Sequence, residues 1–318
     1  MFTPAPNNAS SGFSRQRFLG GALALGGATV LSACGTSTAP STSGSASRSA
    51  SASGGPQRVV ALSTGHLDYC LALGIVPVGL AVAVSEATDS RGIPDYIKQR
   101  FGDRHDLDSI QVVGQRMSPD LEKVAGLKPD LILSNKRADK GLTEKLTGIA
   151  RTVQTNGGSE QFKADLKIVA EAFGKAADGE RLLADYEGRA HAWGQKRGTS
   201  DTISLVRGKG DQYLYFGTLA LASIVGADAG LTRPPAQQFS DTASRPLSLE
   251  QVGLLEADWL FYSFPGGSGD FAEAPLWKKL PAVVEGRAFP VDVDPWFLNA
   301  STVAADRVLA DMQRFMSA

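Results

Sequence analysis

Guanidinium and aromatic side chains gather in segments that are expected to follow strands, such as 115–117 and 135–137. The carboxyl ends of parallel strands meet at one edge of a sheet, so these residues can face a common cleft. Aromatic walls with a few guanidinium donors suit a large, partly apolar ligand that carries oxygen acceptors. The candidate ligand-binding side chains are Arg116, Lys136, Arg137, Tyr213, Tyr215, Phe264, Trp296 and Phe297.

Histidine is too sparse to build a metal site. Only His66, His105 and His191 occur, far apart in the sequence, whereas direct metal binding needs a cluster of histidines and carboxylates. His66 falls in a segment expected at the cleft, where it can contact ligand, cap a helix or lie on the surface. We therefore expect no metal bound by protein side chains and no resident cofactor.

One glycine-rich stretch resembles a catalytic motif. The sequence "FPGGSGD" at 264–270 suggests a nucleophile elbow, but Asp270 stands where the motif G-x-S-x-G requires its last glycine. A glycine-rich cleft loop is the better interpretation. A secreted hydrolase is thus the weaker alternative, and we expect a protein that is not an enzyme.

Short apolar runs alternate with helical segments in both halves of the chain. This alternation is typical of α/β folds with parallel, covered sheets. Between the halves, apolar residues spaced by four, three and four positions from Phe162 to Phe173 predict a helix, and a longer one follows from Asp178 to Gly198. The expected strands cover residues 58–62, 77–82, 130–134, 202–206 and 287–294.

The sequence therefore predicts an α/β protein with two Rossmann-like lobes, each with a central parallel sheet, joined by a single long α-helix. The expected parts are a lipoprotein signal peptide at 1–33, a flexible tether at 34–56, an N-terminal lobe at 57–160, a helical linker at 161–198 and a C-terminal lobe at 199–318.

One helix-and-strand phrase occurs twice, as "LEKVAGLKPDLIL" from Leu121 and as "LEQVGLLEADWLF" from Leu249. Each copy places a glutamate, Glu122 or Glu250, in the opening turn of the expected helix. A carboxylate there complements the helix dipole, so helix stability and duplication alone can account for the pair.

The residues before the two helices favour these starting points. Ser118 precedes Pro119, a common residue in a first turn. In the second copy, Ser248 and Gln251 have the spacing of a capping box.

The N-terminus is typical of an exported lipoprotein. Arg15 and Arg17 precede an apolar run at 18–33 that is too short to span a bilayer comfortably. The run ends in "LSAC", a lipobox-like site with Cys34 as the residue that takes the lipid. Gln16 stands where a twin-arginine signal has its second arginine, so Sec and twin-arginine export both stay open.

Small polar residues dominate the tether, which as a random coil would reach about 25 Å. We therefore expect an extracytoplasmic protein held by its N-terminal lipid on the outer face of the cell membrane. The net charge of −1 gives no support to nucleic-acid binding. We expect a monomer.

From Arg58 onward the chain resembles the periplasmic binding proteins for iron siderophores and cobalamin, the helical-backbone class of ABC importer receptors, and within it the ferric-hydroxamate branch. The matching phrases are "RVVALSTGHLDYCLALGIVPVGL", "VGQRMSPDLEKVAGLKPDLIL", "LSLEQVGLLEADWLF", "APLWKKLPAVVEGRAFPVD" and "WFLNASTVAADRVL". They cover essentially the whole expected folded region.

The resemblance implies a receptor that captures a ferric siderophore, whose own oxygens fill the iron's coordination shell. It also implies delivery to a permease, a homodimer or heterodimer, that works with its ATPase. In that family one surface glutamate of each lobe docks onto permease arginines, and these positions match Glu122 and Glu250.

The same resemblance assigns ligand contacts. Arg116 in "VGQRMSPDLE" and Trp296 in "DPWFLNAS" match ligand-contacting positions of the hydroxamate branch. Arg137 falls where that branch can have an aromatic contact, and Leu298 replaces a possible aromatic residue. Cobalamin and haem are the alternative ligands. Tyr213, Tyr215 and His66 leave an axial haem ligand open.

Overall fold

The computed structural model describes residues 55–83, 91–209, 212–264 and 271–316. The chain divides into two units, 1–51 and 52–318, and all described residues belong to the second. Arg15, Arg17, Cys34 and nearly all of the expected tether lie outside the described residues, as does 265–270 of the "FPGGSGD" stretch. No helix within the described ranges has the length and apolar character needed to cross a bilayer.

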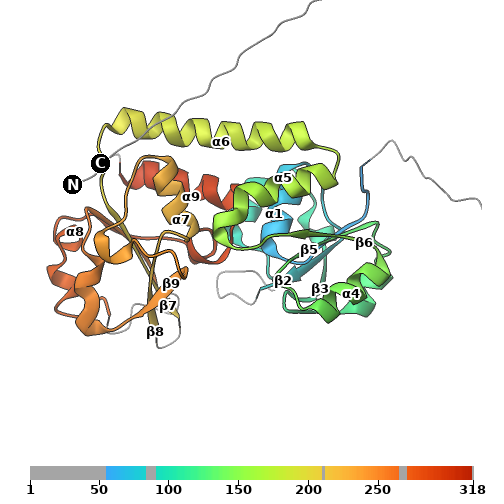
Figure 1. Ribbon diagram of the computed structural model, residues 1–318, viewed down its shortest axis with the longest axis horizontal. Helices are drawn as coiled ribbons and strands as arrows, with labels where there is room; N and C mark the ends of the chain where they lie inside the picture. The colour runs from blue at the N-terminus through green and yellow to red at the C-terminus, as the bar shows by residue number, and fades with distance from the viewer. Residues whose placement is uncertain (1–54, 84–90, 210–211, 265–270, 317–318) are drawn as a thin grey trace, which may run out of the picture. The chain divides into compact units, whose positions relative to one another are not determined.

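The N-terminal lobe is built on a six-stranded sheet with the order β4-β3-β2-β1-β5-β6 (Figure 1). All neighbours pair in parallel except β4, which is antiparallel to β3. Central strands β1 and β5 are buried apolar runs, as expected for a sheet covered by helices on both faces. The strands are β1 Val59–Ala61, β2 Gly79–Val82, β3 Gln111–Gln115, β4 Ser118–Pro119, β5 Leu131–Asn135 and β6 Arg151–Thr155.

The C-terminal lobe has a five-stranded sheet with the order β11-β10-β7-β8-β9. Its β11, β10 and β7 run parallel, whereas β8 and β9 add an antiparallel meander at one edge. The α/β class with two Rossmann-like lobes is thereby confirmed, and both sheets carry antiparallel strands at an edge. The strands are β7 Ile203–Lys209, β8 Gln212–Phe216, β9 Ser244–Leu247, β10 Trp259–Ser263 and β11 Ala288–Pro290.

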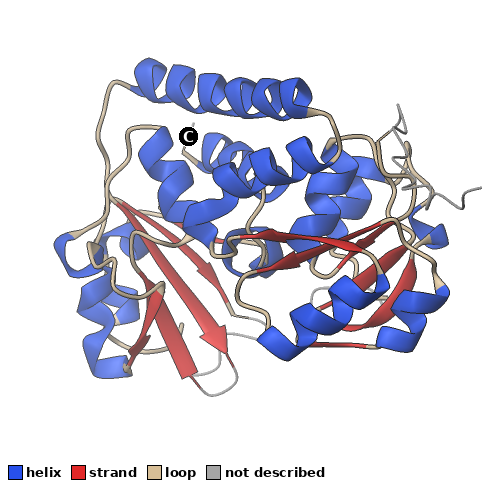
Figure 2. Ribbon diagram, turned by 45° about the vertical axis from the view of Figure 1, so that its right-hand side comes forward, coloured by secondary structure: helices blue, strands red, loops and turns tan. Residues whose placement is uncertain are grey.

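Helices cover the two sheets and connect them (Figure 2). Several begin at side-chain caps, for example α1 at Ser63, whose Oγ accepts from the backbone N–H of His66 at 3.2 Å. The helices are α1 Thr64–Ala72, α2 Asp95–Phe101, α3 Leu121–Gly126, α4 Lys140–Ile149, α5 Phe162–Ala172, α6 Ala176–Arg197, α7 Leu221–Asp228, α8 Pro281–Val284 and α9 Thr302–Phe315.

Helix α6 is the long connection between the lobes (Figure 1). It begins at Ala176, slightly before the expected Asp178, and ends at Gly198, which adopts φ 67° as its C-cap. Its 22 residues span about 33 Å. Lys163 of α5 forms salt bridges to both α6 and α7, because its Nζ lies 2.9 Å from Glu187 of α6 and 2.8 Å from Asp228 of α7.

The lobes share more than this helix. One buried cluster contains Val59 and Leu133 of the first sheet together with Leu205 and Phe261 of the second. Helix α9 packs against α1 and α2 as well as α6 and α7. A continuous core of this kind resists large opening of the lobes, because separating them would expose close-packed apolar surface.

Candidate functional site

A cavity of about 840 Å³ lies where loops of both lobes meet, within the size range of ordinary ligand pockets. The N-terminal lobe supplies segments that follow β1, β3, β5 and β6, and the C-terminal lobe supplies residues around 241–243 and 298–300. The cavity therefore lies at carboxyl ends of parallel strands, as the sequence predicted. Helices α1, α4 and α9 all begin at its wall, and the positive ends of helix dipoles favour anionic groups.

Arg116 and Arg137 both line the cavity with exposed side chains. The backbone N–H of Arg116 donates to Val82 O at 2.8 Å, which fixes the turn after β3. The backbone N–H of Arg137 donates to the side-chain oxygen of Asn135 at 2.9 Å. Gly157 leaves room for Arg137, since a Cβ there would lie 3.1 Å from Arg137 Cδ. The two guanidinium groups thus come from separately anchored turns.

His66 also lines the cavity, but its side chain is only 3% exposed. Its Nε2 lies 3.0 Å from Thr155 Oγ1, and Thr155 Oγ1 in turn lies 3.4 Å from Ser134 O, which it can reach as a donor. Burial, and secondarily the charge of Arg116, lower the pKa of His66 to about 4. The imidazole is therefore neutral at physiological pH and supports the cavity floor.

Trp296 lies away from the cavity wall that a ligand contact requires. The residue belongs to the short π-helical turn Asp294–Leu298 and is 0% exposed. Its indole Nε1 donates to Asp311 Oδ2 at 3.1 Å, and its ring packs 4.7 Å from that of Phe261. Trp296 was expected to contact ligand, but it occupies a core position in this structure, because its indole faces α9 and β10.

The other expected aromatic contacts also lie outside the cavity lining. Tyr213 and Tyr215 share one face of β8 and pack against Phe271 and Phe239, respectively. Phe297 packs 4.9 Å from Phe216. Of the described residues that do line the cavity, only Tyr69 and His66 carry rings. The wall therefore mixes polar and aliphatic side chains and has little aromatic surface.

The sequence prediction missed the loop after β6. Gly157 and Gly158, at φ 72° and 98°, line the cavity together with Thr155 and Ser159. Buried Asp165 holds this loop by accepting from the backbone N–H groups of Asn156 at 2.7 Å and Gly157 at 2.9 Å. The paired glycines directly after a short β-rich run were the signal that could have revealed the loop.

Arg207 was also missed. It lies near the carboxyl end of β7, and its guanidinium lies 5.9 Å from the ring centroid of Phe216. Burial lowers its pKa. It is outside the cavity lining, so its part here is to pack the C-terminal lobe beside the cleft.

Glu122 and Glu250 occupy the first turns of α3 and of the 3₁₀ helix η4, Leu249–Leu255. The N-cap of α3 is Asp120 rather than the expected Ser118. Ser118 and Pro119 instead form β4, and Asp120 Oδ1 accepts from the N–H groups of Glu122 and Lys123, both at 3.1 Å. The expected capping box of the second copy is present, with Ser248 N–H donating to Gln251 Oε1 at 3.2 Å.

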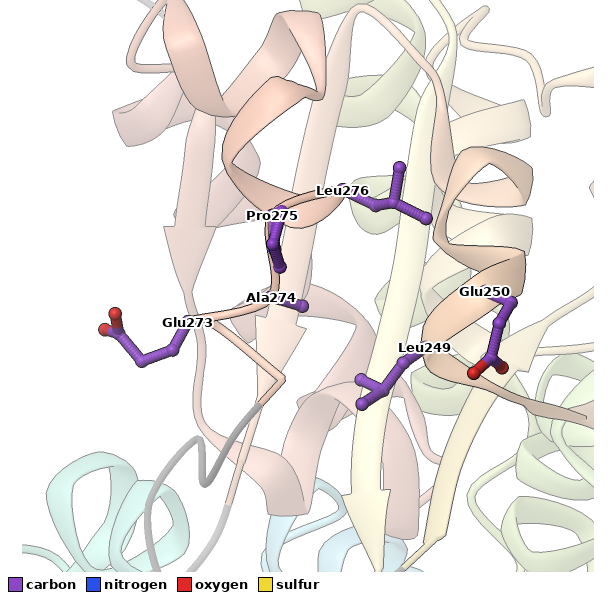
Figure 3. Close-up of a pocket in the computed structure, with 6 residues that line it drawn as sticks. All are labelled: Leu249, Glu250, Glu273, Ala274, Pro275 and Leu276. Atoms are coloured by element: carbon purple, nitrogen blue, oxygen red, sulfur yellow. The ribbon is translucent and has the colours of Figure 1, made fainter.

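Glu250 is fully exposed, and hydrogen bonding from Ser248 and from its own backbone lowers its pKa, so the carboxylate is ionised. Figure 3 shows Glu250 at the edge of a surface hollow, with Leu249 and Leu276 on its walls. Glu122 is likewise exposed, on the N-terminal lobe. Each lobe thus presents one anion in the first turn of a short helix.

A family model described as "Periplasmic binding protein" matches residues 59–294, most of the chain. The chain belongs to the periplasmic binding protein family. The resemblance to periplasmic binding proteins is therefore confirmed. Members of this family bind and carry ligands, which also confirms that this periplasmic binding protein is not an enzyme.

Named relatives and solved structures agree with this family. The chain is 30% identical to "Probable siderophore-binding lipoprotein YfiY" of Bacillus subtilis, covering 82% of each chain. It is 29% identical to "Fe(3+)-citrate-binding protein YfmC" of the same organism, over 77% of this chain and 76% of the relative. The structure of Staphylococcus aureus SirA complexed with staphyloferrin B superposes with a TM-score of 0.72 at 25% identity, covering 83% of this chain and 94% of SirA.

Among the described residues, no three His, Cys, Asp or Glu side chains come together to hold a metal ion. Cys70, the cysteine within those ranges, is buried, and burial raises the pKa of its thiol well above the usual range. The cavity thus offers hydrogen bonding and charge of both signs. Arg116 and Arg137 supply guanidinium groups. The acidic side chains that also line it are Asp139, Glu160, Asp165 and Asp241.

Proposed function

We propose that this periplasmic binding protein captures a ferric siderophore in the cavity between its lobes and delivers it to the permease of an ABC importer. The observation that carries the proposal is the 840 Å³ cavity with Arg116 and Arg137 on its wall. A ferric chelate presents iron-bound, negatively polarised oxygens, which guanidinium groups bind well because their donors form a planar fork. The relatives named as siderophore- and iron-citrate-binding proteins support this ligand class.

Two classes of siderophore are candidate ligands for this cavity. The sequence resemblance favours a hydroxamate chelate, with aromatic residues packing its linker carbons. The scarcity of aromatic surface and the two guanidinium groups favour a carboxylate chelate, whose anionic charge gains from both arginines. The acidic side chains in the lining offset part of this gain. Support for the carboxylate type also comes from the iron-citrate-binding relative.

The alternatives of cobalamin and haem fit this wall less well. Cobalamin needs mainly aromatic packing, of which this wall offers little, and haem usually needs an axial Tyr or His. Tyr69 is 2% exposed and donates its hydroxyl to Phe162 O at 3.0 Å, while His66 is buried against Thr155. Neither ring is available as an axial ligand in this conformation.

Titration of the soluble domain against ferric hydroxamates, ferric citrate-type chelates, ferric catecholates, haem and cobalamin tests the proposal. We expect saturable quenching of tryptophan fluorescence by one ferric siderophore class only. The Arg116→Ala variant should weaken that binding about tenfold to hundredfold, since a hydrogen bond to a charged group is worth about 1.5–3 kcal/mol. Tight binding of haem or cobalamin, with no response to any ferric chelate, would exclude the proposed ligand.

We also propose that the protein is a lipoprotein on the outer face of the membrane, with a signal peptide at 1–33, a lipid on Cys34 and a tether to residue 56. The proposal rests on the lipobox-like "LSAC" and on relatives named as lipoproteins. In the producing cell, Cys34→Ala should release the protein from the membrane fraction and abolish labelling by a radioactive fatty acid. Membrane retention and labelling that both survive the substitution would show that the anchor lies elsewhere.

A further inference from the structure

The hollow beside Glu250 has a volume of about 420 Å³ and lies on the C-terminal lobe, away from the ligand cavity (Figure 3). Its walls come from the start of η4 and from the segment that leads into η5, Trp277–Lys279. We call it the Leu249–Leu276 hollow. The described residues that line it are Leu249, Glu250, Glu273, Ala274, Pro275 and Leu276.

The surface of this hollow is apolar. Leu249 is 37% exposed and Leu276 is 44% exposed, and they are two of the five large hydrophobic side chains exposed in the described part of the chain. Exposed apolar side chains that gather in one concave place mark interaction sites more often than scattered ones do. The hollow is also firmly supported, because Ala274 and Trp277 belong to the buried core of the C-terminal lobe.

Charge at the edge of the hollow is negative. Glu250 is ionised and fully exposed, and no salt bridge to it occurs among the described residues. The second acid, Glu273, already pairs with Lys278 at 2.6 Å. A partner that covers the Leu249–Leu276 hollow must therefore bring a cation to Glu250 and an apolar group to the two leucines.

The N-terminal copy of the repeated phrase lacks an exposed leucine beside its glutamate. Leu121, the counterpart of Leu249, is half-buried against the core of its own lobe. Lys123 follows Glu122 directly and lies 3.8 Å from Asp120, whereas Gln251 takes the corresponding place beside Glu250. The two lobes thus present similar anions in different surroundings, one charged and one apolar.

We propose that the Leu249–Leu276 hollow receives a large aliphatic or aromatic side chain of the permease subunit that meets the C-terminal lobe, next to the basic residue that pairs with Glu250. This inference rests on the proposed delivery to a permease and on the docking role that the family resemblance implies for Glu250, and it adds an apolar contact to that role. Because salt screens exposed charge pairs but not apolar burial, the C-terminal contact keeps part of its strength at high ionic strength. The apolar contact also distinguishes the two lobes for a permease with two different halves.

The first test compares the double substitution Leu249→Ser/Leu276→Ser with Val284→Ser. Val284 is 68% exposed on the same lobe but lies outside the hollow, so it is a matched control. Iron uptake by cells that carry only the variant receptor should fall about tenfold for the leucine pair, the usual effect of removing a buried apolar anchor from an interface. Uptake with Val284→Ser should be unchanged, and ferric siderophore binding should be unchanged in both variants.

The second test identifies what occupies the hollow. In intact cells, Leu276→Cys carrying a thiol-linked photo-crosslinker should join to a membrane permease subunit, at a peptide that contains a basic residue next to a large apolar one. Val284→Cys with the same probe should not. Cys70 is buried and does not compete for the probe.

The effects of the Glu250 and leucine substitutions distinguish the apolar contact from the docking role of Glu250. If reversing the charge of Glu250 abolishes uptake while the leucine pair has no effect, docking stands and the apolar contact is wrong. Crosslinks from Leu276→Cys to a second copy of the receptor would also overturn the inference. Uptake that survives both the charge reversal and the leucine substitutions would remove the docking role itself.

Discussion

Reversing both surface glutamates, Glu122→Lys and Glu250→Lys, is expected to abolish uptake and leave ligand binding intact. The reason is placement: each carboxylate lies in a first helical turn on the surface of its own lobe, and neither lines the ligand cavity. If each carboxylate docks onto a basic residue of the permease, a lysine in its place repels that residue. This repulsion costs several kcal/mol of docking free energy and reduces uptake by at least about a hundredfold. Radiolabelled iron uptake and tryptophan fluorescence measure the two effects.

A matched control carries the same change in net charge elsewhere on both lobes. Glu144 of α4 and Glu285 after α8 have exposed side chains that lie 3.9 Å from Lys140 and beside Arg287, respectively. Glu144→Lys/Glu285→Lys should bind ligand and support uptake as the parent protein does. If this control is equally inactive, the loss reflects overall charge, and the assignment of Glu122 and Glu250 as docking residues fails.

The sequence located the cationic part of the candidate site because that part obeys a local rule. Arg116 and Arg137 each follow a strand within a few residues, as does the neutral His66, and the carboxyl ends of parallel strands share one edge. The loop after β6 obeys the same rule but was missed. Its strand is a polar edge strand with one buried residue, so it has no apolar run that predicts a strand.

The aromatic candidates lie outside the cavity lining because their positions depend on contacts far apart in sequence. The position of Trp296 is set by Phe261 of β10 and Asp311 of α9. The face on which Tyr213 and Tyr215 lie is set by the pairing of β8 with β7, where Tyr215 lies opposite Val206. In the same way, no periodicity in the sequence shows that α9 packs against both lobes.

A buried carboxyl where α9 meets α1 makes stability depend on pH. Asp68 is 0% exposed, and its Oδ2 accepts hydrogen bonds from Tyr96 at 2.7 Å and from Ser301, the N-cap of α9. Burial is the main reason that the pKa of Asp68 is raised to about 7. The two hydrogen bonds lower this pKa, and the nearby charge of Asp294 raises it. Asp68 is therefore largely protonated in the folded protein under mildly acidic conditions.

The direction of this pH dependence is set by which state, folded or unfolded, binds the Asp68 proton. Between about pH 4 and pH 7 the folded protein keeps the Asp68 proton and the unfolded chain has lost it, so the free energy of unfolding falls as pH rises through this window. The loss amounts to roughly 4 kcal/mol, at about 1.4 kcal/mol per pKa unit. His66, with its pKa lowered to about 4, acts in the opposite direction between about pH 4 and pH 6.5. The Asp68 contribution must therefore be measured as a difference between variants.

Asp68→Asn removes the titrating group and keeps an oxygen that can accept from Tyr96 and Ser301. At pH 4.5 the variant should be less stable than the parent by about 1–3 kcal/mol, because its amide N–H groups are buried without partners. By pH 8 this deficit should shrink by roughly 3 kcal/mol or reverse, since only the parent carries a buried charge. Urea unfolding of the soluble domain at both pH values measures the change, with exposed Asp108→Asn as the control. Parallel stability curves for parent and Asp68→Asn would show that Asp68 is ionised in the folded protein, and that the contact between α1 and α9 is held by a charge.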